Sequence, residues 1–241
     1  MINKSEITIT DKEISIDFGI VNFVTIYDPH GKQYIISGKP LIAINTYYNN
    51  KINNAELLLK KEKSSTKIVH QESSKLFSKM NKKCDKIIKQ IRILSAQKEN
   101  KINNYINKTI TWILTTYSNY KRIIIGHNNY WKGNNFDQFL YNKFLNKLKN
   151  GLEKNNKELK LVDESYTSKC DALALEEICR KEQYFGTRPT RGLFMSSIGK
   201  MINADLNAAI NIMRKWKIQN GIKLKEITGE NIFNPEKIKI V

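Results

Sequence analysis

The sequence predicts an α/β fold, in which helices flank a mixed β-sheet, and three observations predict it. Residues 14–37 alternate runs of β-branched and aromatic residues with short turns, which is typical of three strands joined in a meander. Residues 73–112 place apolar side chains at helical spacing and contain no Pro or Gly. Two short apolar runs, 121–125 and 159–162, then lie on either side of an amphipathic segment, and strands that alternate with helices indicate an α/β sheet.

The meander and the first helix follow from local patterns. A small turn at Phe18–Gly19 separates the first two strands, and residues 28–31 form the turn before the third. From residue 41 to about 62 the pattern becomes helical with a Lys-rich face. Residues 63–72 are predicted to form a loop.

The second half of the chain contains two further predicted helices. Residues 136–152 are amphipathic, and residues 204–217 place four apolar side chains on one face. Between them, residues 170–198 are predicted to be irregular, because two Gly and one Pro interrupt any long element. A meander that leads into a mixed sheet covered by helices is the element order of an RNase H-like fold. We therefore expect one such domain over residues 1–220, with a helical insertion at about 73–112 and a basic C-terminal tail over 221–241.

Composition excludes several classes of protein. The chain has 241 residues, of which 40% are hydrophobic, and this is enough to build a core. Its three cysteines, Cys84, Cys170 and Cys179, cannot form the disulfide framework of a small secreted domain. No apolar run approaches the roughly 18–20 residues that a membrane span needs, and the N-terminus has no signal-peptide core. We expect a cytoplasmic protein that does not bind membranes.

The charge of the chain indicates a polyanionic partner. Lys and Arg total 41 against 23 Asp and Glu, which gives a formal net charge of +18. An AT-rich genome would raise the Lys content without any functional demand, but the same bias should also favour Glu. Nucleic acid is therefore the favoured partner, since Lys and Arg release counterions from phosphates.

Three acidic residues lie where an active site of this fold is expected. Asp17 is at the bend of the first strand, Glu164 follows the 159–162 strand, and Asp205 opens the last helix. Each has a structural alternative: a turn residue, a solvent-facing acid and a helix-capping acid, respectively. If the three meet, Mg²⁺ or Mn²⁺ would relieve their repulsion and could support phosphodiester hydrolysis.

Six segments, in this order, resemble those of one family. They are D-F-G-I-V-N-F-V-T-I from Asp17, K-P-L-I-A-I-N-T-Y-Y-N from Lys39, I-I-I-G-H-N-N-Y-W-K from Ile123, D-E-S-Y-T-S-K-C from Asp163, R-G-L-F from Arg191 and N-A-D-L-N-A-A-I-N-I from Asn203. The segments resemble the RuvC nuclease domain of the TnpB (OrfB) proteins of insertion sequences, which are related to compact type V CRISPR effectors. The resemblance covers roughly residues 14–217.

This resemblance implies an RNA-guided DNA endonuclease with a RuvC-type RNase H-like fold, a divalent-metal site, and DNA and a guide RNA as partners. Its catalytic and metal-binding acids fall on Asp17, Glu164 and Asp205. The commoner branch of the family has its Glu where this chain has Gly126, whereas the branch that this sequence most resembles has an acid at the position of Glu164. A carboxylate shifted to the neighbouring strand could enter the same pocket.

The chain departs from the family pattern in two ways. Many relatives carry a four-cysteine zinc ribbon, of which only Cys170 and Cys179 remain, so no zinc is expected. Relatives also carry a long region before the first Asp motif that holds the guide RNA, whereas sixteen residues precede Asp17 here. A separate protein partner replacing that region, or a degenerate remnant, is therefore an open alternative.

Further side chains are candidates for nucleic-acid binding: Lys39, Trp131, Lys132, Lys169, Arg188 and Arg191. A solvated basic loop explains Lys169, Arg188 and Arg191 equally well, and a packed side chain under a loop is the favoured interpretation of Trp131.

Two functions compete with a DNA nuclease. A cleavage-deficient, guide-dependent DNA-binding relative is motivated by Gly126 and by the two departures. An ATP-binding domain of the sugar-kinase and actin type is disfavoured, because neither a second Asp-Gly phosphate loop nor a Gly-Gly adenosine segment follows residue 120.

Overall fold

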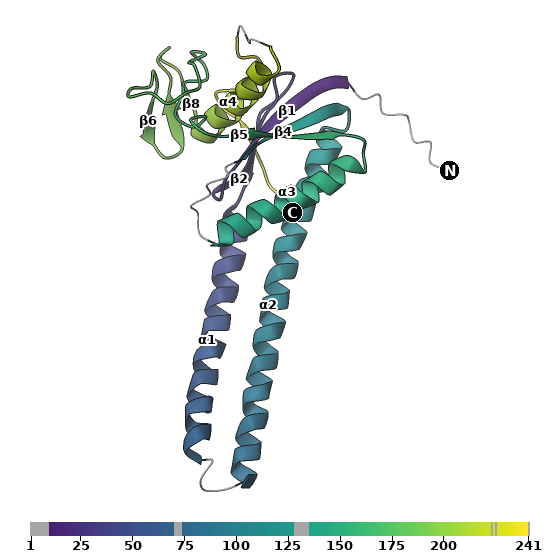
Figure 1. Cartoon of the computed structure of the whole chain (residues 1–241), viewed down its shortest axis with the longest axis vertical. Coiled ribbons are helices and arrows are strands. Elements are labelled where there is room, and N and C mark those ends of the chain that lie inside the picture. The colour runs from purple at the N-terminus through teal and green to yellow at the C-terminus, as the bar shows by residue number, and fades with distance from the viewer. Residues whose placement is uncertain (1–9, 70–73, 128–134, 223, 225, 241) are drawn as a thin grey trace, which may run out of the picture. The chain divides into compact units, whose positions relative to one another are not determined.

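The computed structural model describes residues 10–69, 74–127, 135–222, 224 and 226–240 (Figure 1). The elements are β1 (Thr10–Phe18), β2 (Asn22–Tyr27), β3 (Tyr34–Ser37), α1 (Lys39–Val69), α2 (Ser74–Thr116), β4 (Tyr120–His127), α3 (Asn135–Glu153), β5 (Glu158–Asp163), β6 (Thr187–Thr190), β7 (Leu193–Met195), β8 (Met201–Asn203), α4 (Ala204–Gln219) and β9 (Glu236–Ile238). Within these residues, no helix combines the length and the apolar character that crossing a bilayer requires.

A mixed sheet of six strands forms the centre of the fold, in the order β5-β4-β1-β2-β3-β9. The β1–β2 and β2–β3 pairs are antiparallel, whereas the β1–β4, β4–β5 and β3–β9 pairs are parallel. Strands β6, β7 and β8 form a separate antiparallel sheet. This confirms the predicted α/β class, and the arrangement is consistent with an RNase H-like fold.

Strand β1 is covered on both faces, which explains why both the polar and the apolar side chains that alternate along residues 13–16 are buried. On one face, the Ser15 hydroxyl donates to the carbonyl oxygen of Ala209 in α4 at 2.6 Å. On the other face, the ring of Phe18 packs against Phe23 and against Tyr141 and Phe144 of α3, with centroids 5.2 to 5.8 Å apart. The alternation of side chains along β1 therefore sends Ser15 and its neighbour two residues on, Asp17, towards the α4 face.

Helix α4 is anchored at its N-terminus and along its buried face. The side chain of Asn203 is the N-cap and accepts hydrogen bonds from the backbone N–H groups of Asp205 and Leu206. Asn207 and Asn211 are fully buried, and both donate to the carbonyl oxygen of Cys170. These bonds fix the turn that follows β5 against the first half of α4.

Two compact units make up the chain, and they differ from the predicted boundaries. One unit contains the sheet and comprises the residues up to Gly38 and from Asn107 onward, whereas the other is Lys39–Ile106, the hairpin of α1 and α2. The helical part is thus larger than the insertion expected at about 73–112, because α1 belongs to it. Helix α1 also continues to Val69, so most of the predicted loop at 63–72 is helical.

The segment after residue 221, expected to be a basic tail, contributes a strand to the sheet. Tyr34, Ile35 and Ile36 of β3 pair with Glu236, Lys237 and Ile238 of β9. Sequence periodicity did not predict β9, because a three-residue strand has too few positions to show alternation.

Candidate functional site

Asp17 lies near the end of β1, on the sheet face that α4 covers. Its side chain is partly buried. Ile16 pairs with Ile125 in the parallel β1–β4 ladder, so Gly126 is the neighbour of Asp17 on the adjacent strand. Register neighbours in a parallel pair project to the same side of the sheet.

The Glu164 carboxylate lies over Gly126. The Glu164 backbone N–H donates to the carbonyl oxygen of His127 at 3.1 Å, which fixes this residue directly beyond β5. A Cβ atom on Gly126 would lie 3.2 Å from Glu164 Oε2 and 2.7 Å from Ile212 Cδ1. The Glu164 side chain therefore fills the space in which a side chain at position 126 would begin.

Asp205 is in the first turn of α4, where the helix dipole favours a negative charge. It is not the N-cap, since Asn203 has that role. Asn22, at the start of β2, donates from Nδ2 to Asp205 Oδ2 at 2.7 Å, and Arg188 Nη2 lies 3.7 Å from Asp205 Oδ1. Both carboxylate oxygens of Asp205 thus have a partner. Asn22 was not predicted as a site residue from the sequence.

The carboxyl of Asp17 is influenced electrostatically by the other two acids. The pKa of the Asp17 carboxyl is raised well above its usual value, first by burial and then by the negative charges of Asp205 and Glu164, while Arg188 acts in the opposite direction. Asp17 therefore lies within electrostatic range of both other carboxylates.

A preformed metal cluster is not part of this arrangement. In the portion of the chain that the structure describes, no three His, Cys, Asp or Glu side chains are gathered closely enough to hold one metal ion. The donor set nevertheless fits a hard divalent cation, because carboxylate oxygens are its preferred ligands. A cation would also relieve the carboxylate repulsion that, after burial, raises the pKa of Asp17.

A groove of about 440 Å³ opens beside Asp205. Its lining comes from the β1–β2 connection and the start of β2, from β6 and the turn after it, and from the first turn of α4: Gly19, Ile20, Val21, Asn22, Arg188, Arg191, Gly192 and Asp205. Arg188 Nε also donates to the carbonyl oxygen of Arg191 at 3.0 Å, which ties the two arginines into one turn. The groove therefore combines guanidinium groups with a carboxylate.

Tyr141 of α3 contacts Gly126 and His127 of β4 and was not predicted as a site residue. Its hydroxyl is 2.8 Å from His127 Nδ1 and donates to the carbonyl oxygen of Gly126 at 3.3 Å. The pKa of Tyr141 is raised by burial and, secondarily, by the charge of Glu164. Because Tyr141 comes from α3, only the folded arrangement reveals it.

The other predicted nucleic-acid contacts are spread over the chain. The Lys169 ammonium lies 5.8 Å from the centroid of the Tyr184 ring, and its side chain is exposed. Lys39 is the exposed first residue of α1, in the helical unit. Trp131 and Lys132 lie outside the described residues. Arg188 and Arg191 are thus the predicted contacts that line the groove.

Two buried carboxylates organise the segment between Glu164 and Asp205. Asp171 accepts hydrogen bonds from the Ser196 hydroxyl at 2.8 Å and from the Ser197 N–H at 2.7 Å. Glu176 accepts from the backbone N–H of Asp171 at 2.7 Å. These bonds tie the turns that follow β5 to the residues directly after β7, and Cys170 and Cys179 in the same segment are free thiols.

Two family models match the chain. OrfB_IS605, described as a probable transposase, matches residues 3–121, and a Cas12f1-like, TNB domain matches residues 141–212. The first match contains Asp17, and the second contains Glu164, Arg188 and Asp205. A comparison with curated proteins found no match.

Proposed function

Because the chain belongs to the TnpB family of transposon-associated, RuvC-like nucleases, relatives of compact type V effectors, we propose that it is an RNA-guided, divalent-metal-dependent DNA endonuclease. In this proposal, Asp17, Glu164 and Asp205 hold Mg²⁺ or Mn²⁺ and the groove beside Asp205 receives a DNA strand.

The observation that carries the proposal is the position of Glu164 over Gly126. Sequence alone leaves open whether an acid beyond β5 reaches the pocket next to Asp17. The distance of 3.2 Å between Glu164 Oε2 and a Cβ at position 126 supports a position of Glu164 in this pocket, because residue 126 neighbours Asp17 on the sheet. The raised pKa of Asp17 also supports the proximity of Glu164 to Asp17, and it supports the proximity of Asp205, because the charges of both residues contribute to it after burial.

The residues of the site have separate roles. The three carboxylates supply hard oxygen ligands, and Asn22 orients Asp205 through its 2.7 Å hydrogen bond. Arg188 and Arg191 neutralise and position a DNA phosphate in the groove. A bound divalent ion would activate water and stabilise negative charge on the scissile phosphodiester. In the structure, the Arg188 guanidinium also partly compensates the negative charge of Asp205.

A second candidate is a nucleic-acid-binding relative that cleaves poorly. The observation that favours it is the engagement of Asp205 by both Asn22 and Arg188, together with the lack of a gathered three-ligand cluster among the described residues. Under this alternative, Arg188 remains paired with Asp205 when DNA is bound.

Metal-dependent cleavage of DNA by the protein, purified with any RNA that it retains, separates the two candidates. Glu164→Ala is compared with Asp163→Ala, since Asp163 is the adjacent exposed acid, paired with Lys215 at 2.7 Å. We expect cleavage to fall by about 10³-fold, equivalent to about 4 kcal/mol, for Glu164→Ala only. Mn²⁺ binding, followed by electron paramagnetic resonance, should weaken in the same variant. Wild-type protein that binds Mn²⁺ weakly and cuts no DNA would support the second candidate instead.

A further inference from the structure

The α1–α2 hairpin carries more than half of the net charge of the chain. Residues Lys39–Ile106 contain fifteen Lys or Arg and five Asp or Glu, a net charge of +10 out of +18. None of the three acids proposed for catalysis belongs to this unit. The proposed cleavage site therefore does not explain why so much positive charge is placed on the hairpin.

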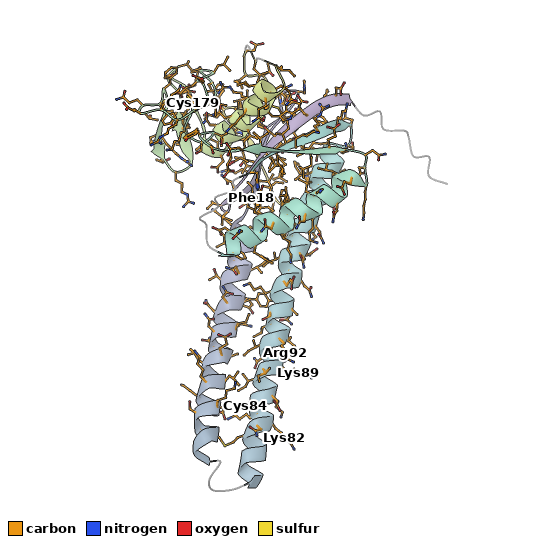
Figure 2. The ribbon with its side chains drawn as sticks, viewed as in Figure 1. Phe18, Lys82, Cys84, Lys89, Arg92 and Cys179 are labelled. Carbon is orange, nitrogen blue, oxygen red and sulfur yellow. The ribbon has the colours of Figure 1, made fainter. Side chains whose placement is uncertain are left out.

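Helix α2 has a buried face and an exposed lysine face within this unit. Cys84 and Ile102 are buried, whereas Lys82, Lys86 and Lys89 are exposed. Figure 2 shows Lys82 and Lys89 on the side of α2 away from α1. Spacings of four and three residues place the three lysines on one side of the helix, with rises of about 6 Å and 4.5 Å between them.

The charge on this face is balanced only in part within the protein, because Asp85 is the one acid between Lys82 and Lys89. Among the described residues, Lys82, Lys86 and Lys89 form neither an ion pair nor a side-chain hydrogen bond, whereas the neighbouring Lys83 pairs with Glu62 of α1. Like charges four residues apart on a helix disfavour folding by about 0.2–0.5 kcal/mol per pair. An external polyanion would compensate them.

The same face continues with amides rather than aromatic rings. Asn100 and Asn104 are exposed. Asn100 follows Lys89 by eleven residues, about three helical turns, which places it on the same side of α2, and Asn104 lies one turn further on. Ile93 is exposed between them and the lysines. The exposed side chains of α2 between residues 82 and 104 include no aromatic ring that could stack on a base. Amide groups both donate and accept, which matches the 2′-hydroxyl that RNA has and DNA lacks.

We propose that this lysine face, formed by Lys82, Lys86 and Lys89 with Asn100 and Asn104, binds the sugar-phosphate backbone of double-stranded RNA. The inference rests on the proposed function, in which the protein carries a guide RNA. It assigns the RNA a surface on the hairpin, separate from the groove assigned to the DNA strand. Recognition is by charge and by the 2′-hydroxyl, without reading of bases.

The test compares two triple variants of the full-length protein. The first is Lys82→Gln, Lys86→Gln and Lys89→Gln. The matched control is Lys60→Gln, Lys61→Gln and Lys63→Gln, which removes the same charge from exposed lysines of α1 in the same hairpin. The probe is a labelled RNA stem-loop in EDTA, titrated at several salt concentrations, and circular dichroism verifies that both variants are folded.

The first variant should lose three phosphate contacts. Its slope of log K against log salt should become shallower by about 2 to 3, and its affinity should fall on the order of a hundredfold at about 0.15 M salt. The control should change affinity by less than about threefold, because exposed charges away from the contact are screened. Equal losses in the two variants would overturn the assignment to α2. Equally tight, lysine-dependent binding of a DNA stem-loop of the same sequence would overturn the assignment to RNA.

Binding and cleavage separate this inference from the proposed function. RNA binding in EDTA does not depend on a divalent ion, so loss of binding in the first variant supports the inference even if wild-type protein cuts no DNA. Metal-dependent cutting by wild-type protein, combined with unchanged RNA binding in the first variant, would refute the inference and leave the proposed function standing.

Discussion

Gly126→Ala is a direct test of the packing around the acidic residues, because the space over Gly126 is already filled. The added methyl group would lie 2.7 Å from Ile212 Cδ1 and 3.2 Å from both Cβ and Oε2 of Glu164. The first distance is too short for two carbon atoms that are not bonded to each other, so the Ile212 side chain must shift. The distance of 3.2 Å to Glu164 is tight, so the Glu164 side chain must move by a few tenths of an ångström.

The expected cost follows from these contacts. Overpacking a core costs about 1–3 kcal/mol, whereas replacing Gly by Ala within a strand returns about 0.5–1 kcal/mol. We expect a net loss of about 1–2 kcal/mol, measured by urea denaturation. Ile212→Val removes Cδ1 itself and alone costs about 0.5–1.5 kcal/mol. The double variant should be more stable than the sum of the single effects predicts, by about 1 kcal/mol.

The rate of DNA cleavage distinguishes the contact of the added methyl group with Ile212 from its contact with Glu164. Ile212→Val relieves the contact with the isoleucine but not the contact with Glu164, so the double variant should recover stability without recovering DNA cleavage. Strictly additive stabilities would show that Gly126 and Ile212 do not meet. Full recovery of cleavage together with stability would show that Glu164 does not depend on the glycine.

Three further predictions concern buried polar groups. Lys157→Met should lower the free energy of unfolding by about 2 kcal/mol, because the Lys157 ammonium donates to three backbone carbonyl oxygens at 2.6 to 2.9 Å; an unchanged urea midpoint would contradict this. Burial raises the pKa of Asp28, so the folded protein favours the protonated carboxyl and its stability should fall as the pH rises from about 4 through the raised pKa. Asp28→Asn should remove this part of the pH dependence in thermal melts, and a profile parallel to wild type would argue against it. Asp171→Ala should destabilise the protein by about 2 kcal/mol and speed proteolysis between β5 and α4, because it leaves the buried Ser196 hydroxyl without its acceptor; proteolysis at the wild-type rate would rule out this role.

Local patterns predicted the elements whose own residues determine them. The meander, the strands at 121–125 and 159–162 and the helices at 136–152 and 204–217 all appear within a few residues of their expected bounds. Strand β9, the end of α1 and the small sheet of β6, β7 and β8 were not predicted, so the expectation that residues 170–198 are irregular was wrong for residues 187–190 and 193–195. The four short strands are specified by their pairing with other strands, and the end of α1 lies in a polar Ser- and Lys-rich segment without apolar periodicity.

The candidate site was predictable only in part, for a similar reason. Asp17, Glu164 and Asp205 could be selected as acids at strand and helix ends, and their metal-binding role stays a prediction. The hydrogen bond from Asn22 to Asp205 joins residues 183 positions apart, and Tyr141 reaches Gly126 from a helix on the opposite side of the sheet from α4. No periodicity within either segment encodes such contacts.

The outer strands of the six-stranded sheet bear on how the protein behaves at high concentration. Strand β5 carries Glu158, Lys160 and Asp163, and β9 carries Glu236 and Lys237. Each free edge offers unpaired backbone groups that another copy could extend, and charged side chains there oppose such edge-to-edge aggregation. Solubility during purification should consequently depend on keeping these two short strands charged.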